Sequence, residues 1–243
     1  MVFTPPFLGI VRFLVRFHCH NKGVFIRIEF TAIFASALIL VVSGGVIFAE
    51  SGVATAALHQ LMEGNVRFVA GQMSHPHQDP ERRKSLADSQ RPVAVVVACS
   101  DSRVAPEFVF DQGLGDLFVV RSDGNLVDSV GLGSIEYAVE HLGVELIVVM
   151  GHEKCGAVTA AVTPGSYSVS IQVLADQIRN HLKSAHLSSN SAVLAAVEAN
   201  IKVDEAELVT ESPMIQEKLA SGHLKIVGGT YSLSEGTFLM SED

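Results

Sequence analysis

The strongest constraint on the fold is a continuous run of mostly β-branched residues, Val93–Ala98. A run with no polar alternation is typical of a strand that is buried on both faces of a sheet. Shorter apolar runs follow at Leu117–Val120, Leu146–Met150 and Leu224–Val227. Helical patterns separate the later runs, at 134–142, 169–187 and 191–209. This alternation predicts an α/β fold with a parallel-core β-sheet flanked by helices.

The segments outside this core are predicted to form helices and a surface loop. Residues 51–70 have helical spacing, which we expect to be broken at Gly64. Residues 71–92 are polar and contain three prolines, which predicts a surface loop. Ser212 and Pro213 are suited to begin another helix that ends at Gly222.

The first 49 residues are a different kind of polypeptide. They are basic, whereas residues 50–243 are acidic, and the stretch from Phe30 to Ala49 has no charged residue. A basic flank, an apolar stretch and a small residue before Glu50 are typical of an export signal. The stretch is also long enough to span a bilayer. We therefore expect 1–49 to be an export signal or membrane anchor and 50–243 to be the catalytic domain.

This reading places the protein in the periplasm or outside the cell, after cleavage of the signal. An uncleaved segment would tether it to a membrane through 30–49, and a cytoplasmic protein with an unusual N-terminus is the third alternative. The formal net charge of −9 argues against a nucleic-acid partner, which would require a basic face.

Metal-binding side chains follow two of the predicted strands, at the point where each strand ends. Cys99 and Asp101 come after the first strand, and His152 and Cys155 come after the third. Because the carboxyl ends of parallel strands lie at one edge of a sheet, both pairs should meet there. Two thiolates and one imidazole are a ligand set for catalytic zinc with an open fourth position. A disulfide between the two cysteines is the alternative in an exported protein.

Asp101 and Arg103 are placed to govern that fourth position. A carboxylate beside the metal can orient a bound water, and a guanidinium can hold that carboxylate through a planar, bidentate fork. The alternative is a surface salt bridge. Asp116 and Arg121 are expected to form structural hydrogen bonds at the same sheet edge.

The chain resembles the β-class carbonic anhydrases in several segments: CSDSR at 99–103, DQGLGDLFVVR at 111–121, GSIEYAVEHLG at 133–143, GHEKCGAV at 151–158 and the tail at 212–236. The resemblance covers residues 55–240. It implies reversible hydration of carbon dioxide to bicarbonate and a proton by zinc-bound hydroxide. It also implies the fold of that family and a homodimer or dimer-based oligomer.

The resemblance also implies roles for individual residues. Cys99, His152 and Cys155 would bind one Zn²⁺ per chain, and Asp101 would join them only in a closed form of the site. In the open form Asp101 and Arg103 would be catalytic. Three further positions match substrate-binding residues of the family, with the two aromatic residues usually contributed across a dimer interface: Gln90, Phe118 and Tyr137.

Two departures from the family pattern matter. The chain has no Trp, and Val96 stands where one branch uses a Trp in an inhibitory bicarbonate site. We therefore expect this chain to lack that site and to favour the open form. Asp123 stands where the family usually has a small apolar residue facing the pocket. It either faces the carbon dioxide pocket, or it turns toward solvent or pairs with a nearby base.

Two other functions remain open from the sequence. An enzyme of the same fold could hydrolyse carbon disulfide or carbonyl sulfide with the same zinc chemistry. A non-catalytic protein that binds zinc or bicarbonate could result from the charge of Asp123.

Overall fold

The computed structural model describes residues 52–187 and 192–241, so the predicted export signal or anchor at 1–49 lies outside the described residues. The core is a five-stranded sheet in the order β2-β1-β3-β4-β5. Its strands are β1 (Ala94–Cys99), β2 (Leu117–Ser122), β3 (Leu146–His152), β4 (Lys225–Tyr231) and β5 (Phe238–Met240). The first four are parallel, as predicted, and β5 adds an antiparallel edge strand that was not predicted.

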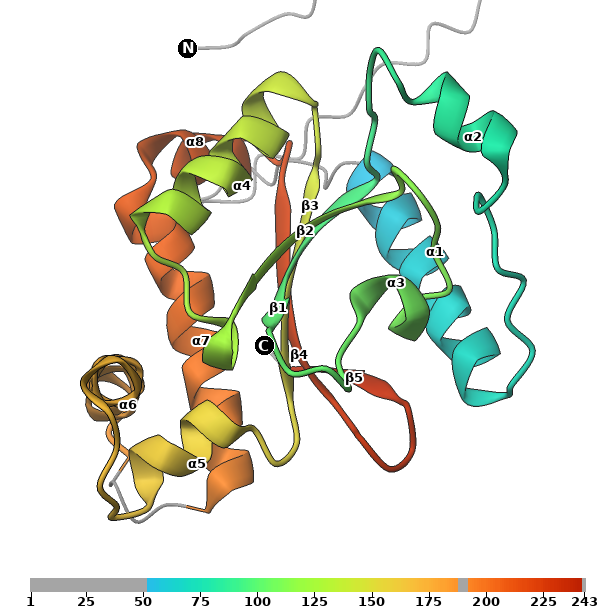
Figure 1. The fold of residues 1–243 in the computed structure, drawn as a ribbon. Coiled ribbons are helices and arrows are strands. Elements are labelled where there is room, and N and C mark those ends of the chain that lie inside the picture. The colour runs from blue at the N-terminus through green and yellow to red at the C-terminus, as the bar shows by residue number, and fades with distance from the viewer. Residues whose placement is uncertain (1–51, 188–191, 242–243) are drawn as a thin grey trace, which may run out of the picture. The chain divides into compact units, whose positions relative to one another are not determined.

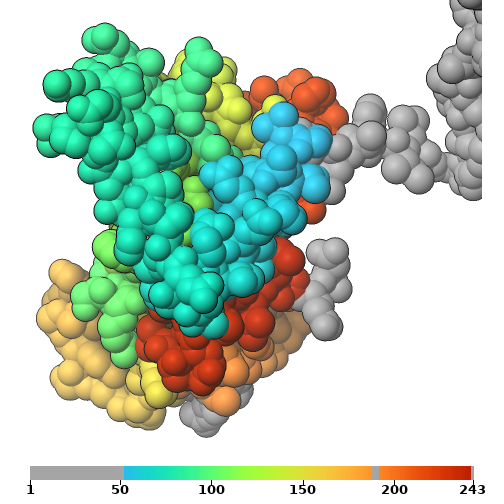
Figure 2. All heavy atoms as spheres, turned by 90° about the vertical axis from the view of Figure 1, so that its right-hand side faces the viewer, coloured from blue at the N-terminus to red at the C-terminus, as the bar shows by residue number. Residues whose placement is uncertain are grey.

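Helices cover both faces of the sheet (Figure 1). One face is covered by α4 (Ser129–His141), α5 (Gly156–Val162), α6 (Val169–Ser184), α7 (Val193–Glu211) and α8 (Pro213–Ala220). The other is covered by α1 (Gly52–Val69) and α3 (Pro106–Val109), with α2 (Pro80–Ser85) farther out. Figure 2 is seen from this second side and shows α1 and the chain that follows it covering much of it.

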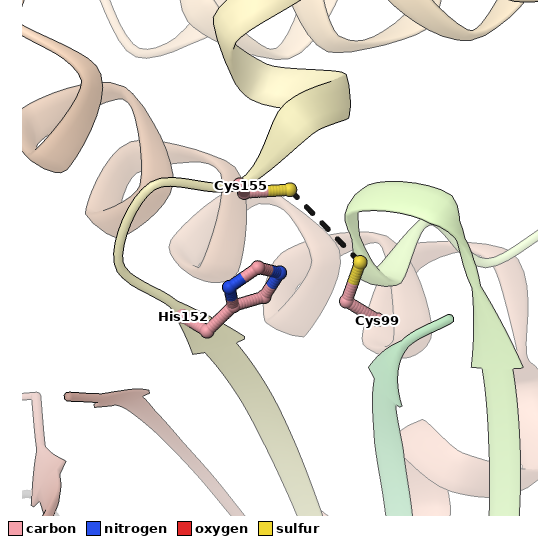
Figure 3. A group of neighbouring side chains, drawn as sticks. All are labelled: Cys99, His152 and Cys155. Carbon is pink, nitrogen blue, oxygen red and sulfur yellow. Dashed lines mark hydrogen bonds between the residues drawn. The ribbon is translucent and has the colours of Figure 1, made fainter. Parts of the chain in front are cut away.

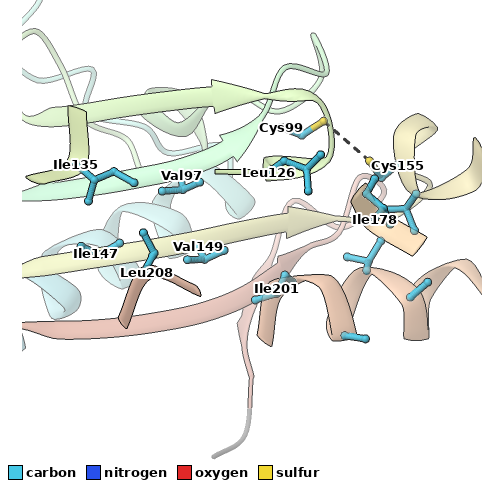
Figure 4. Packing of buried hydrophobic residues seen from close by; sticks show 14 of the residues in the cluster. Val97, Cys99, Leu126, Ile135, Ile147, Val149, Cys155, Ile178, Ile201 and Leu208 are labelled. Atoms are coloured by element: carbon cyan, nitrogen blue, oxygen red, sulfur yellow. Dashed lines mark hydrogen bonds between the residues drawn. The ribbon is translucent and has the colours of Figure 1, made fainter. Parts of the chain in front are cut away.

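The core has two parts because successive side chains of a strand point to opposite faces. Val95, Val97 and Cys99 of β1 pack on the α4–α8 side, and Ala94, Val96 and Ala98 pack on the α1 side. In Figure 4, Val97 and Val149 from the strands face Ile178 and Ile201 from α6 and α7, and the two cysteines lie at the end of this cluster. The fully buried β1 explains its unbroken apolar sequence.

The break predicted at Gly64 is wrong, because α1 continues through it. A Cβ atom at this position would lie 1.7 Å from the carbonyl oxygen of Phe110. The glycine therefore serves close packing of α1 against the chain after α3, rather than interruption of the helix.

Short elements escaped prediction. The expected loop 71–92 contains α2, which Asp79 caps by accepting a hydrogen bond from the Arg82 amide. The turns α3 and α5 were also not predicted, and both are too short for a periodic pattern. The predicted cap at Ser212 is confirmed, since its side chain accepts a hydrogen bond from the Ile215 amide. In the described part of the chain, no helix combines the length and apolar character needed to cross a bilayer.

Candidate metal centre

The parallel register brings the predicted ligands to one edge of the sheet. Cys99 is the last residue of β1, and His152 is the last residue of β3, its neighbour. Cys155 follows through a turn in which Lys154 adopts a positive φ of 52°. All three side chains are buried. The structure therefore confirms that the two halves of the predicted ligand set meet.

The three ligand atoms converge on one point (Figure 3). The sulfurs of Cys99 and Cys155 lie 4.0 Å apart, and one potential ligand atom from each of the three residues lies within 4.8 Å of the others. Both cysteines are free, so the disulfide alternative is not realised. A disulfide would hold the sulfurs about 2.05 Å apart.

The tautomer of His152 suits a metal ligand. Its Nδ1 lies 2.8 Å from the Glu153 carbonyl oxygen, which accepts a hydrogen bond from the Nδ1–H group. Nε2 therefore presents a lone pair to the sulfurs. This Nε2 is buried and has no hydrogen-bond partner within the described residues. A buried acceptor without a partner is costly, and a metal ion held with the two sulfurs would satisfy it.

Backbone amides favour the thiolate form of Cys99. The amides of Asp101 and Gly124 donate to its sulfur at 3.5 and 3.3 Å. The hydrogen bond from the Cys155 thiol, helped by these amides and opposed by burial, lowers the pKa of Cys99 to about 4. The same pairing raises the pKa of Cys155 well above its usual range. The thiolate of Cys99 is therefore favoured without a metal ion, whereas the negative charge of a Cys155 thiolate would need a cation beside it.

Asp101 is held beside the ligands by Arg103. The guanidinium Nε donates to Oδ1 at 2.9 Å, NH2 donates to Oδ2 at 2.6 Å, and the Arg103 amide donates to Oδ1 at 2.9 Å. These bonds hold the pKa of Asp101 well below its usual range. Oδ2 lies 4.0 Å from Nε2 of His152. The predicted bidentate fork is present, and it points the carboxylate toward the ligand cluster.

Arg121 supports the loop that carries Asp101. Its side chain donates to the carbonyls of Cys99 and Asp101 at 3.0 and 2.8 Å, as expected of a structural residue at this edge. Asp116 is at the other end of β2, where it accepts hydrogen bonds from His77, Arg82 and Gly113. The prediction that Asp116 lies at the same sheet edge as Arg121 is wrong. Asp116 precedes the first residue of β2, whereas Arg121 is near the end of that strand, beside the metal-ligand cluster.

The predicted substrate-binding residues do not gather around the metal ligands within one chain. Gln90 is exposed and precedes β1, whereas Cys99 ends it. Phe118 pairs with Val95 near the beginning of β1. Tyr137 is half exposed on α4, with its ring 5.1 Å from that of His141.

The turn η1 (Asp123–Asn125) closes the site from the side of β2. Asp123 is exposed, which favours the alternative that it turns toward solvent. Its neighbour Gly124, at a φ of +69°, is the residue that presents an amide to Cys99. Gly124 was not among the site residues predicted from the sequence. Its signal in the sequence is a glycine two residues after the end of β2, where the chain must turn.

Comparison with known proteins decides the family. The sequence model of the carbonic anhydrase family matches residues 94–238, which include all of these ligands. Carbonic anhydrase 2 of Mycobacterium tuberculosis is 43% identical over 194 residues, covering 77% of this chain and 92% of the relative. This chain belongs to the β-carbonic anhydrase family.

Further members support the same assignment. The carbonic anhydrase of Mycolicibacterium smegmatis is 46% identical over 185 residues, covering 74% of this β-carbonic anhydrase and 90% of the relative. The crystal structure of a β-carbonic anhydrase from Aspergillus fumigatus matches with a TM-score of 0.61 at 27% identity, covering 77% of this chain and 90% of that one. A Coccomyxa β-carbonic anhydrase matches with a TM-score of 0.58 at 27% identity, covering 78% and 86%. The predicted fold class is therefore confirmed.

Proposed function

We propose that this β-carbonic anhydrase catalyses the reversible hydration of carbon dioxide to bicarbonate and a proton. The observation that carries the proposal is the buried cluster of two cysteine sulfurs and an unpartnered imidazole nitrogen, beside a carboxylate fixed by an arginine. Membership in the carbonic anhydrase family supports it.

One zinc ion per chain would be held by Cys99, His152 and Cys155. Their donor atoms fit zinc, because thiolate sulfur and imidazole nitrogen are its common protein ligands and three such ligands leave the fourth position open. When bound, zinc supplies Lewis acidity that lowers the pKa of a water molecule toward neutrality.

Asp101 is the residue that would orient the reacting water. Its carboxylate remains ionised at neutral pH because Arg103 lowers its pKa, so it accepts hydrogen bonds and does not donate them. The position of Oδ2, 4.0 Å from Nε2 of His152, leaves it beside the ligand cluster without closing on it. The fork from Arg103 thus supports the open form of the site.

A second copy of this chain would complete the substrate pocket. Gln90 and Phe118 lie toward the opposite end of β1 from Cys99, and a six-residue strand is about 20 Å long. Strand β2 is an edge strand, and its apolar residues from Leu117 to Val120 are only partly buried. We propose that this edge, with Tyr137, lies against a partner subunit in a homodimer. Sedimentation analysis tests this, and a monomer that is active at full rate would contradict it.

We further propose that residues 1–49 direct export to the periplasm. Their basic flank and uncharged stretch support this, and the apolar stretch could otherwise tether the enzyme to a membrane. The test is the N-terminal mass of the protein recovered from cell fractions. A full-length, unprocessed chain in the cytoplasm would contradict it.

The activity itself is tested by stopped-flow hydration of carbon dioxide between about pH 7 and about pH 9. We expect turnover that rises with pH as the water deprotonates. Carbon disulfide and carbonyl sulfide should be offered to the same preparation. Turnover of these thio-analogues without hydration of carbon dioxide would support the hydrolase function instead. Full zinc occupancy without any turnover would indicate a non-catalytic binding protein.

A further inference from the structure

A second cluster of potential metal ligands lies between α6 and α7. His181 comes from α6, and Asp204 and Glu207 come from α7. One potential ligand atom from each of these residues lies within 4.8 Å of the others. Nε2 of His181 is 3.3 Å from Glu207 Oε1, and Nδ1 is 3.6 Å from Asp204 Oδ1. The cluster is mostly buried, since His181 is 8% exposed and Asp204 is 0% exposed.

Asp204 carries a buried oxygen that lacks a partner. Its Oδ2 accepts hydrogen bonds from Asn125 at 2.6 Å and Asn200 at 3.1 Å. Its Oδ1 accepts none within the described part of the chain and faces the ring of His181. Burial raises the pKa of Asp204 well above its usual value, with Glu207 and Glu205 adding to the rise. A cation next to Oδ1 would remove this penalty.

The hydrogen bonds of Asn200 fix the tautomer of His181. The amide nitrogen of Asn200 donates to the Gly124 carbonyl at 2.9 Å and to Asp204 Oδ2, so its amide oxygen is left to accept. That oxygen lies 2.9 Å from Nδ1 of His181, which must therefore carry the ring proton. In the neutral ring, Nε2 then directs a lone pair toward the carboxylate of Glu207. A cation beside both atoms would satisfy this contact, as would a proton on Nε2 that is donated to Glu207.

The surroundings of the cluster supply negative charge and a route for entry. A cleft of about 360 Å³ opens onto His181 and Glu207. Asp128 and Glu211 also line it, and none of its described lining residues is a lysine or an arginine. Such a cleft concentrates cations at its mouth.

We propose that His181, Asp204 and Glu207 form a second metal site that binds a divalent transition-metal cation such as Zn²⁺. Imidazole nitrogen with two carboxylate oxygens is a donor set that zinc accepts, whereas Mg²⁺ prefers oxygen ligands alone and retains its waters. The bound cation would pair with Oδ1 of Asp204 and keep this carboxylate ionised.

The second site is connected to the first through η1. Asn125 and Asn200 both donate to Asp204, and Asn200 also donates to the carbonyl of Gly124. Gly124 in turn presents its amide to Cys99. Because hydrogen bonds to an ionised carboxylate are stronger than those to a neutral one, the cation would hold η1 more firmly against the metal centre.

The test is equilibrium dialysis of the full-length zinc holoenzyme against Zn²⁺, followed by measurement of metal content. Glu207→Gln removes a ligand charge, whereas Glu211→Gln removes a charge from the same cleft without touching the cluster. We expect the wild type and Glu211→Gln to take up about one more zinc per chain than Glu207→Gln. Carbon dioxide hydration of Glu207→Gln without added metal should equal that of the wild type, which shows that the variant is folded.

The comparison of the two variants corrects for other zinc binders. His18, Cys19 and His20 are present in all three proteins, so their contribution cancels in the difference. Equal zinc uptake by Glu207→Gln and Glu211→Gln would overturn the proposal. So would uptake that an equal concentration of Mg²⁺ abolishes, because the site would then be an unselective acidic cleft. Neither result would affect the first zinc or the hydration activity assigned to it.

Discussion

Replacing Arg103 separates the orientation of Asp101 from its charge. Arg103→Leu removes the two side-chain hydrogen bonds of 2.9 and 2.6 Å and leaves only the bond from the residue 103 amide. Without the guanidinium, the pKa of Asp101 returns toward the ordinary value of about 3.9. The carboxylate is therefore still ionised in an assay near neutral pH, and any loss of activity reflects its position.

The expected loss follows from how such supporting contacts act. Partners that orient groups around a metal typically contribute about 10-fold to about 100-fold in activity. We expect Arg103→Leu to lie in this range, because a carboxylate held by one bond can swing toward Nε2 of His152, only 4.0 Å from Oδ2. Arg103→Lys keeps a positive charge but lacks the planar fork, so it should recover only part of the rate.

The assay is stopped-flow carbon dioxide hydration, with zinc content measured on each sample. Zinc content should stay at the wild-type level, because Arg103 makes its hydrogen bonds to Asp101 and not to Cys99, His152 or Cys155. Wild-type kcat/KM in Arg103→Leu would show that catalysis does not depend on the orientation that Arg103 gives to Asp101. Equal activity of the Lys and wild-type proteins would show that charge alone matters.

Other predictions concern packing, the buried acid and the departure at η1. Gly64→Ala should destabilise the fold by about 3 kcal/mol, because its Cβ would overpack against Phe110. Gly133→Ala should stabilise α4 by about 0.5 kcal/mol, because the space around its Cβ is open. Equal denaturant midpoints for the two variants would contradict this. Because the pKa of Asp204 is raised in the folded protein, this residue stabilises the fold most in acid, and that stabilisation is lost as pH rises. Without added metal, the free energy of unfolding of Asp204→Asn should therefore rise relative to that of the wild type, by at most about 1.4 kcal/mol per pH unit. A difference in denaturation that does not depend on pH would be evidence against this. Asp123→Ala should leave the hydration rate and its pH profile unchanged, since Asp123 is exposed, and a shifted profile would place its charge in the pocket.

Much of the sheet could be predicted because its strands are buried on both faces. An unbroken apolar run that is mostly β-branched, such as Val93–Ala98, favours a buried strand, and its end fixes the position of Cys99. Parallel order then places His152 at the same edge, so the metal ligands followed from the strand ends. The short β5 left no comparable pattern in three residues.

What escaped prediction depends on contacts between distant segments. Gly64 was expected to break a helix, but its neighbour in space is Phe110, 46 residues away along the chain. Asn200 and Asp204 look like ordinary polar positions of a helix, and only the folded chain brings them to η1. Hydrophobic periodicity predicts which face of a helix or strand is apolar. It does not predict which polar side chains of different elements contact one another in the interior of the fold.

We propose that hydration depends on one zinc ion held by Cys99, His152 and Cys155. The most direct measurement is carbon dioxide hydration while zinc is returned to protein from which a chelator has removed it. We expect activity to be absent without zinc and to rise in proportion to the first equivalent, to a maximum at about one zinc per chain. Activity that survives complete removal of zinc, or fails to return when the first equivalent is bound, would contradict it.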